Sequence, residues 1–217
     1  MMQPVVAGCL PDGRIGQRAA MVTHVAELLK ELPPRFALAG FSLGGLIALE
    51  LAAQAPDRIT RLALLCAGAG PETPEGAALR RSGEARAERV GLVAHALQDL
   101  VPRYDLAPDS EQAGMVAGMA VAVGLTLYRR QNDLAISRAD SRGRLGSLRM
   151  PVRLVSGACD RLCPPERHVE MLAGLSNARV TTVPGCGHML PLADPTGLTE
   201  LVGWLCQPSG LQDNQRN

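Results

Sequence analysis

The feature that most constrains this chain is a Gly-x-Ser-x-Gly pattern, Gly40-Phe41-Ser42-Leu43-Gly44, set between an apolar run and a helical run. The apolar run from Phe36 predicts a strand, and the run that continues to Leu51 predicts a helix. The residues between them therefore form a sharp turn from strand to helix. Glycine is needed at both ends of the turn, because Cβ atoms there would collide in so tight a reversal.

This turn predicts that Ser42 is a nucleophile. Its backbone is expected to be strained, which holds the hydroxyl clear of the main chain. The free amides of the first helical turn would point at the group under attack, and the amide of Leu43 is placed to face a developing oxyanion. Tight packing alone is the alternative explanation. A phosphate loop is disfavoured, because no lysine follows the glycines and the spacing fits neither a Walker loop nor a dinucleotide fingerprint.

Composition narrows the class of protein. The chain has 217 residues, 47% of them hydrophobic, which suits one domain over residues 1–207 and a flexible polar tail over 208–217. A net charge of +1 suggests neither nucleic acid nor a membrane as partner. The start of the chain lacks the pattern of a secretory signal, so a cytoplasmic protein is expected. The apolar run from Met115 to Tyr128 is too short to span a bilayer and predicts a buried helix.

Strands alternate with helices in two parts of the chain. This alternation predicts an α/β fold, with a mostly parallel sheet and helices on both faces. Loops at the carboxyl ends of such strands bind ligands, and Ser42 lies at such an end. The predicted strands cover residues 4–10, 36–39, 59–67, 152–156 and 180–183, and the first and last predicted helices cover 21–32 and 198–205.

The alternation stops between the third and fourth predicted strands. Residues 69–147 read as two helical patterns, separated by a break from Pro102 to Pro108, with no strand among them. We expect this segment to be a helical lid inserted over the site, with extra helical packing as the alternative. The apolar positions of its second helix are expected at Met115, Met119, Val123 and Leu127.

Two further polar residues directly follow predicted strands, as Ser42 does. Asp160 comes after the strand at 152–156, and His188 comes after the strand at 180–183. His188 would take the proton of Ser42 as general base, and Asp160 would orient the imidazole and stabilise its charged form. Hydrogen bonding within the loops is the alternative for both residues.

Other acids and histidines compete for these roles. Glu72 follows the preceding strand and is the second choice for the acid, whereas Asp140 and Asp194 lie further from any strand end. His168, on the helix after Asp160, is expected to face solvent. We expect His24 at the surface or its boundary, and His95 in a structural role.

The cysteines do not predict a metal site. Most of the six cysteines are expected to be buried thiols in a reducing compartment. Cys159, Cys163 and Cys186 with His188 could imitate a zinc site, but their spacing matches no common zinc module. We therefore expect no metal.

Three segments resemble the signature segments of the α/β-hydrolase superfamily: Gly40 to Gly45, Gly157 to Pro165, and Gly185 to His188. The element order from about residue 5 to 206 is similar too. The resemblance implies Ser42 as nucleophile, Asp160 as acid and His188 as base. It also implies hydrolysis of a small carboxylic ester, a lactone or a related acyl bond, with a small-molecule acyl substrate and no cofactor.

The chain departs from this resemblance before Ser42. Members of the superfamily usually begin with additional strands, and a loop after one of them, often starting His-Gly, supplies the second oxyanion amide. Too few residues precede Ser42 to hold these strands, so either the protein starts upstream of Met1 or the chain is a shortened variant. In a shortened variant, Val5 to Ala7 would lie beside the nucleophile strand, and Gly8-Cys9-Leu10 would replace the missing loop.

Such shortening has two expected consequences. An unpaired strand edge favours pairing with a second copy, and therefore a homodimer. Loss of one oxyanion donor lowers the rate by about two to three orders of magnitude. The alternative function is accordingly a truncated or non-catalytic protein of this fold that acts as a binding module.

Overall fold

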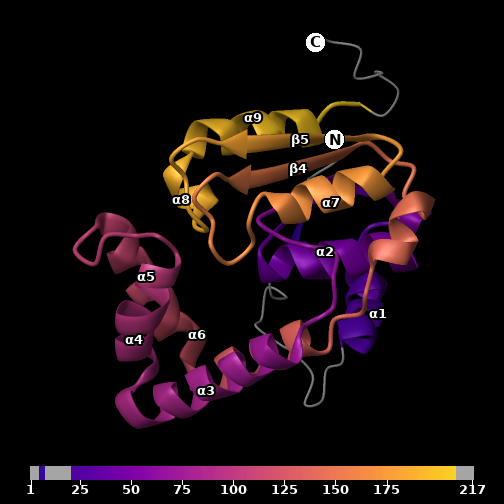
Figure 1. Cartoon of the computed structure of the whole chain (residues 1–217). Coiled ribbons are helices and arrows are strands. Elements are labelled where there is room, and N and C mark those ends of the chain that lie inside the picture. The colour runs from indigo at the N-terminus through magenta and orange to yellow at the C-terminus, as the bar shows by residue number, and fades with distance from the viewer. Residues whose placement is uncertain (1–4, 8–20, 209–217) are drawn as a thin grey trace.

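A five-stranded parallel sheet organises the molecule. The computed structural model describes residues 5–7 and 21–208 (Figure 1). Its strands lie in the order β1-β2-β3-β4-β5. The α/β class with a parallel sheet, predicted from the alternation, is thus confirmed. The strands are β1 (Val5–Ala7), β2 (Phe36–Phe41), β3 (Ile59–Leu65), β4 (Val152–Gly157) and β5 (Ala178–Val183).

The short strand β1 lies beside the strand that leads to Ser42. It pairs in parallel with β2, with Val5 opposite Leu38 and Ala7 opposite Gly40. The expected position of Val5 to Ala7, beside the strand that leads to Ser42, is thus confirmed. β1 ends at Ala7, level with Gly40, two residues before Ser42. Gly8-Cys9-Leu10, the expected replacement for the oxyanion loop, lies outside the described residues.

Helices cover both faces of the sheet. One face packs against α1 (Met21–Glu31), α2 (Leu43–Gln54) and α7 (Glu166–Gly174), with Leu38, Leu62 and Leu154 of the strands fully buried beneath them. The other face packs against α8 (Leu190–Ala193) and α9 (Pro195–Leu205). Alternate residues of each strand point to opposite faces, so both cores draw on the same strands.

The final helix begins three residues earlier in the structure than the sequence predicted. The structure starts α9 at Pro195, where the prediction started it at Leu198. Asp194 caps the helix by accepting a hydrogen bond from the amide of Gly197 at 2.9 Å. Pro195 suits the first helical position, since it has no amide hydrogen to satisfy there.

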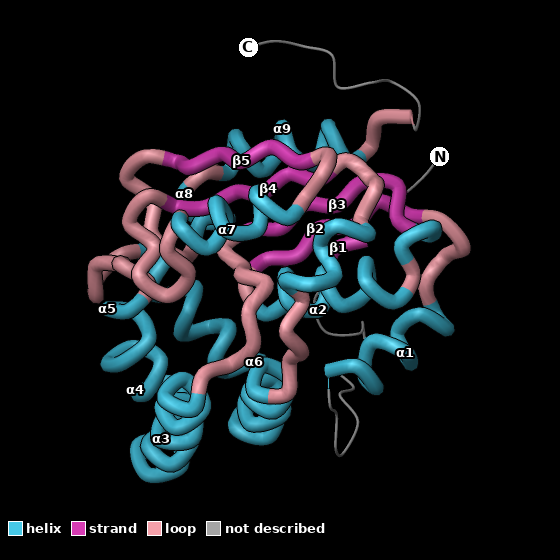
Figure 2. The backbone as a smooth tube through the Cα atoms, turned by 45° about the vertical axis from the view of Figure 1, so that its right-hand side comes forward, coloured by secondary structure: helices cyan, strands magenta, loops and turns pink. Residues whose placement is uncertain are grey.

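Helices alone connect β3 to β4, as predicted. They are α3 (Pro74–Val90), α4 (Leu92–His95), the π-helical turn η2 (Ala96–Leu100), α5 (Val101–Arg103) and α6 (Glu111–Ile136), and the 3₁₀ turn η3 (Arg142–Ser147) follows. A second 3₁₀ turn, η1 (Pro56–Arg58), precedes β3. The tube view shows α3, α4 and α6 standing to one side of the sheet (Figure 2).

The predicted apolar face of α6 is wrong in its first half. Met115 and Met119 are 45% and 44% exposed, whereas Val116 and Ala120 are buried. In its second half, Leu127 packs against the core as predicted. The run from Met115 to Tyr128 is therefore not a buried helix. Because almost every position of this stretch is apolar, its sequence carries little information about which face packs. Within the described ranges, no helix is both long and apolar enough to cross a bilayer.

Candidate active site

Ser42 occupies the turn between β2 and α2 in a strained conformation. Its φ is 50° and its ψ is −116°, in agreement with the prediction. Its amide donates to the Leu65 carbonyl at 2.9 Å, which continues the pairing of β2 with β3 up to the turn. A Cβ atom on Gly40 would overlap the backbone of Gly44, so the expected need for glycine is met. Leu43 follows as the first residue of α2.

The structure brings Ser42, His188 and Asp160 together. The Nε2 atom of His188 lies 2.9 Å from the Oγ atom of Ser42, and its Nδ1 atom lies 2.9 Å from Oδ2 of Asp160. His188 and Asp160 are only 5% and 3% exposed. The three side chains follow β2, β4 and β5, so the carboxyl edge of the sheet collects them from distant parts of the chain.

The Asp160 carboxylate is fixed by its own loop. Its Oδ1 atom accepts hydrogen bonds from the amides of Leu162 and Cys163, both at 2.9 Å. Burial alone would raise the pKa of this carboxyl group, but the hydrogen bond and charge of His188 and these two amides hold the pKa below its ordinary value. The Asp160 carboxyl group is therefore ionised at neutral pH.

Close backbone contact sets the distance between Asp160 and His188. A Cβ atom on Gly157, at the end of β4, would overlap the carbonyls of Cys186 and Gly187. The amide of Cys159 also donates to the Cys186 carbonyl at 2.8 Å. Glycine at the strand end thus lets the loop that carries the acid lie directly against the loop that carries the histidine.

Two aromatic rings flank the imidazole of His188. The Phe41 ring centroid lies 5.4 Å away in a tilted arrangement, and the Tyr104 centroid lies 5.5 Å away with the rings 25° apart. A Cβ atom on Gly187 would overlap the Tyr104 carbonyl, so the histidine loop touches the helical segment. Sequence reasoning missed Tyr104, because it lies in the break between two helical patterns and belongs to no motif.

Cys66 is a second neighbour of the site that the sequence did not single out. It directly follows β3, has a φ of 50° and is 2% exposed. Burial raises the pKa of its thiol, and the nearby Asp160 carboxylate adds to this rise. The signal available was its position after a strand, shared with Ser42, but a cysteine at the end of a leucine-rich strand also reads as core.

The rival acids are engaged elsewhere. Glu72 pairs with Arg80 at 2.6 Å and with Arg138 at 2.9 Å, at the base of the helical segment. Asp140 pairs with Arg142 at 2.6 Å on the surface, and Asp194 caps α9. His188 therefore has Asp160 as its carboxylate partner. Glu72 and Asp140 form ion pairs, and Asp194 caps a helix.

The other histidines are buried, which corrects two expectations. His168 is fully buried rather than facing solvent, since its side chain points from α7 into the core. Its pKa is lowered by this burial to about 4. His24 is 6% exposed, because α1 turns it toward the body, and burial lowers its pKa as well. His95 contacts Asp99 at 2.7 Å and Tyr128 at 3.1 Å, which suits a structural role.

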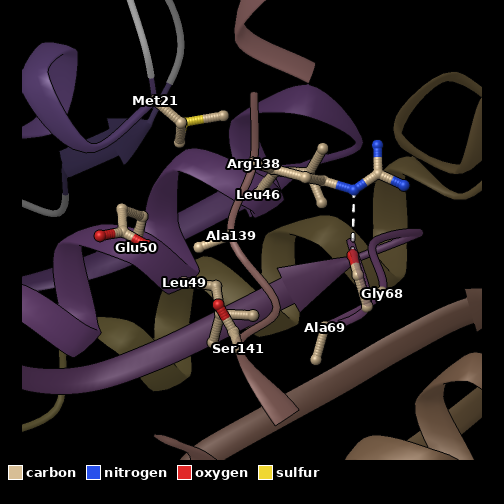
Figure 3. A pocket seen from close by; sticks show the side chains of 10 residues that line it. Met21, Leu46, Leu49, Glu50, Gly68, Ala69, Arg138, Ala139 and Ser141 are labelled. Carbon is tan, nitrogen blue, oxygen red and sulfur yellow. Dashed lines mark hydrogen bonds between the residues drawn. The ribbon is translucent and has the colours of Figure 1, made fainter. Parts of the chain in front are cut away.

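A small cavity lies at the base of the helical segment, apart from the three site side chains. Its volume of about 10 Å³ is room for one water molecule and far too small for an acyl substrate. Figure 3 shows Met21, Leu49 and Glu50 around it, and Arg138 whose Nε atom donates to the Gly70 carbonyl at 3.0 Å. We assign this cavity a packing role.

Comparison with known proteins identifies the family. Residues 7–201 match the alpha/beta hydrolase family. The chain belongs to that family. The predicted resemblance is thereby confirmed, and the hydrolase class with it.

Relatives and solved structures agree with this assignment. The chain is 30% identical over 190 residues to the pimeloyl-[acyl-carrier protein] methyl ester esterase of Aromatoleum aromaticum, covering 81% of this chain and 75% of that protein. The esterase of the same name from Neisseria meningitidis is 30% identical over 182 residues, and the match covers 79% of this chain but only 58% of that protein. A thermophilic esterase from Thermogutta terrifontis has a similar structure, with a TM-score of 0.73, 25% identity, and coverage of 88% and 74% of the two chains.

Proposed function

We propose that this hydrolase is a serine esterase, in which Ser42 is the nucleophile, His188 the general base and Asp160 the residue that orients it. The observation that carries the proposal is the continuous chain of contacts from Ser42 Oγ through the imidazole to Asp160, 2.9 Å at each link. The strained φ of Ser42 supports it, because strain of this kind concentrates at functional sites.

The reaction follows from the positions of these atoms. Ser42 Oγ attacks the acyl carbon while its proton moves to His188 Nε2, and the substrate oxygen gains negative charge. The amide of Leu43 stabilises this oxyanion. Collapse of the intermediate expels the alcohol, which takes the proton from His188 and leaves an acyl group on Ser42. A water molecule, activated by His188, then releases the acid and restores the serine.

We propose that the second oxyanion amide comes from the residues that follow β1. Ala7, the last residue of β1, pairs with Gly40, two residues before Ser42, which supports this. If no second amide reaches the site, the rate is expected to fall by about 10²- to 10³-fold. If the loss of the second amide removes all activity, the alternative applies, and the protein is a non-catalytic binding module.

The substrate is proposed to be a small ester with an apolar acyl part. Both relatives described above are named as methyl ester esterases, which supports esters of small alcohols. The proposed lid, residues 69–147, supplies an apolar wall. Its side chains Val116, Ala120 and Tyr104 cluster with Phe41 and Met189, the neighbours of Ser42 and His188 in sequence.

Labelling with a fluorophosphonate tests the nucleophile. Such a reagent modifies only an activated serine, so we expect one labelled peptide containing Ser42. The matched control is Ser147→Ala, since Ser147 is exposed and its hydroxyl bonds only the Arg144 carbonyl. We expect Ser42→Ala to abolish labelling and to lower kcat/KM for short-chain methyl esters by roughly 10³-fold or more.

Peptide mass spectrometry and titration of released acid provide the readouts. Folded wild-type protein that takes up no label would contradict the esterase proposal and favour the binding module. Labelling retained in Ser42→Ala would instead assign the nucleophile to another residue.

A further inference from the structure

One cluster includes two of the proposed catalytic residues and combines three kinds of metal ligand. The sulfur of Cys66, a carboxylate oxygen of Asp160 and a ring nitrogen of His188 all lie within 4.8 Å of one another. All three side chains are buried. Esterase chemistry by a serine needs no thiol at this place, so Cys66 is left without a role in the mechanism.

We propose that Cys66, Asp160 and His188 form an inhibitory binding site for a thiophilic divalent cation such as Zn²⁺. The metal would bind Sγ of Cys66, the carboxylate of Asp160 and the Nδ1 atom of His188, which already faces that carboxylate at 2.9 Å. Three protein ligands leave the fourth position of a tetrahedral ion for water.

The geometry requires only small movements. Ligands bound tetrahedrally to one zinc ion at about 2.0 to 2.3 Å lie roughly 3.3 to 3.7 Å apart. Nδ1 of His188 and Oδ2 of Asp160 are 2.9 Å apart, and one ligand atom from each of the three residues lies within 4.8 Å of the other two. Side-chain shifts of about an ångström would therefore form the site. Asp160 Oδ1 can remain bonded to the amides of Leu162 and Cys163, which would orient the ligand as outer-shell partners do.

The charges of the bound state balance. Metal binding displaces one proton from the Cys66 thiol to solvent, so the ion meets one thiolate and one carboxylate, and the buried cluster has no net charge. The proton on Nδ1 of the neutral imidazole moves to Nε2. His188 could then donate to Ser42 but not accept its proton, so the general base would be lost. Inhibition rests on the proposed function, whereas metal binding itself does not.

Hard cations would not compete for this site. Mg²⁺ and Ca²⁺ take oxygen ligands and avoid thiolates, so neither is expected to bind or inhibit. The cluster considered from the sequence, Cys159 with Cys163 and Cys186, is different. Cys159 is exposed, while Cys163 and Cys186 are buried, and in the described part of the chain it is Cys66 that joins His188 in a ligand cluster.

Cobalt spectroscopy tests binding without reference to activity. Co²⁺ bound to a thiolate gives a near-ultraviolet charge-transfer band, so titrated wild-type protein should show this band with one equivalent of metal. We expect the band in Ser42→Ala too, even though that variant is inactive. Cys66→Ser should weaken binding by about 100-fold or more, beyond the roughly 10- to 100-fold cost of losing an outer-shell partner. Cys206→Ser is the matched control, since Cys206 is exposed.

Zinc inhibition supplies the second readout. Each variant is compared with its own metal-free rate, and we expect Zn²⁺ to inhibit wild type reversibly, with activity restored by a chelator. Absence of the cobalt band in wild type, or an unchanged band in folded Cys66→Ser, would overturn the proposal. Circular dichroism checks folding, and Cys66→Ala replaces the serine variant if that variant does not fold. An inactive wild type that still shows the band would sink the esterase proposal alone.

Discussion

The imidazole of His188 has two aromatic rings as neighbours, and only one of them belongs to the serine motif. Phe41 precedes Ser42 in the turn, whereas Tyr104 comes from the helical segment between β3 and β4. An aromatic face attracts a cation, so both rings are suited to the imidazolium that would form if His188 acts as the proposed general base. Tyr104 would thus act as a positioning residue that links the helical segment to the base.

Replacing Tyr104 separates this ring contact from other roles. We expect Tyr104→Leu to lower kcat about 3- to 10-fold with a smaller effect on KM, which is the size expected of a partly exposed cation–π contact. Tyr104→Phe keeps the ring and should retain near wild-type kcat. Steady-state kinetics on one methyl ester measure both. Equal damage from the two variants would assign the effect to the hydroxyl, and an unchanged kcat in Tyr104→Leu would refute the role.

Which site residues could be predicted depends on where they sit in the chain. Ser42, Asp160 and His188 each follow a predicted strand of a parallel sheet, so their meeting at one edge could be foreseen. The prediction missed Cys66 and Tyr104. Cys66 has the same strand-end position but no motif, and Tyr104 reaches the site only through the packing of helices whose sequence is nearly uniform in polarity.

At the scale of the element, helix α7 carries a buried histidine with no compensating partner. Neither ring nitrogen of His168 has a hydrogen-bond partner among residues 5–7 and 21–208, and the side chain is fully buried. A hydrophobic side chain at this position would pack without the free-energy cost of burying two ring nitrogens that lack hydrogen bonds. Helical periodicity did not reveal the burial, because a histidine at the boundary of an amphipathic face suits solvent equally well.

The lowered pKa of His168 predicts acid sensitivity. The unfolded state takes up a proton near pH 6.5, but the folded state does so only near the folded pKa of about 4. Stability is therefore full above pH 6.5 and is lost as pH falls toward 4, by about 2 kcal/mol at pH 5 for a folded pKa of about 4.

Urea denaturation of wild type and His168→Met at pH 7.5 and pH 5.0 measures this difference. We expect the free energy of unfolding of the variant to fall less on acidification, by about 2 kcal/mol. The comparison between variants cancels the other titrating groups. The same pH dependence in both proteins would show that His168 is protonated in the folded state at an ordinary pH.

At the scale of the whole molecule, one arginine joins the two ends of the helical segment. The Arg138 guanidinium donates to the Gly70 carbonyl at 3.0 Å, to the Pro71 carbonyl at 3.2 Å and to the Glu72 carboxylate at 2.9 Å. It therefore ties the loop that leaves α6 to the loop that enters α3. Burial would raise the pKa of Glu72, but hydrogen bonds from Arg80 and Arg138 lower it instead.

We therefore expect Arg138 to stabilise the base of the proposed lid. The side chains of Arg138 and Glu72 are 18% and 10% exposed, so removing one partner leaves a largely buried charge. We expect Arg138→Ala to lower the free energy of unfolding by about 1 to 3 kcal/mol, and hydrogen exchange to rise in residues 70–73 and 135–139.

The control is Arg142→Ala, whose pair with Asp140 is 48% and 43% exposed and should change stability by less than about 0.5 kcal/mol. If the segment roofs the substrate site, Arg138→Ala should also raise KM for apolar esters, because Tyr104 and the apolar wall would be less firmly placed. A variant with faster exchange at the base of the segment but unchanged KM would argue that these helices stabilise the fold without covering the site.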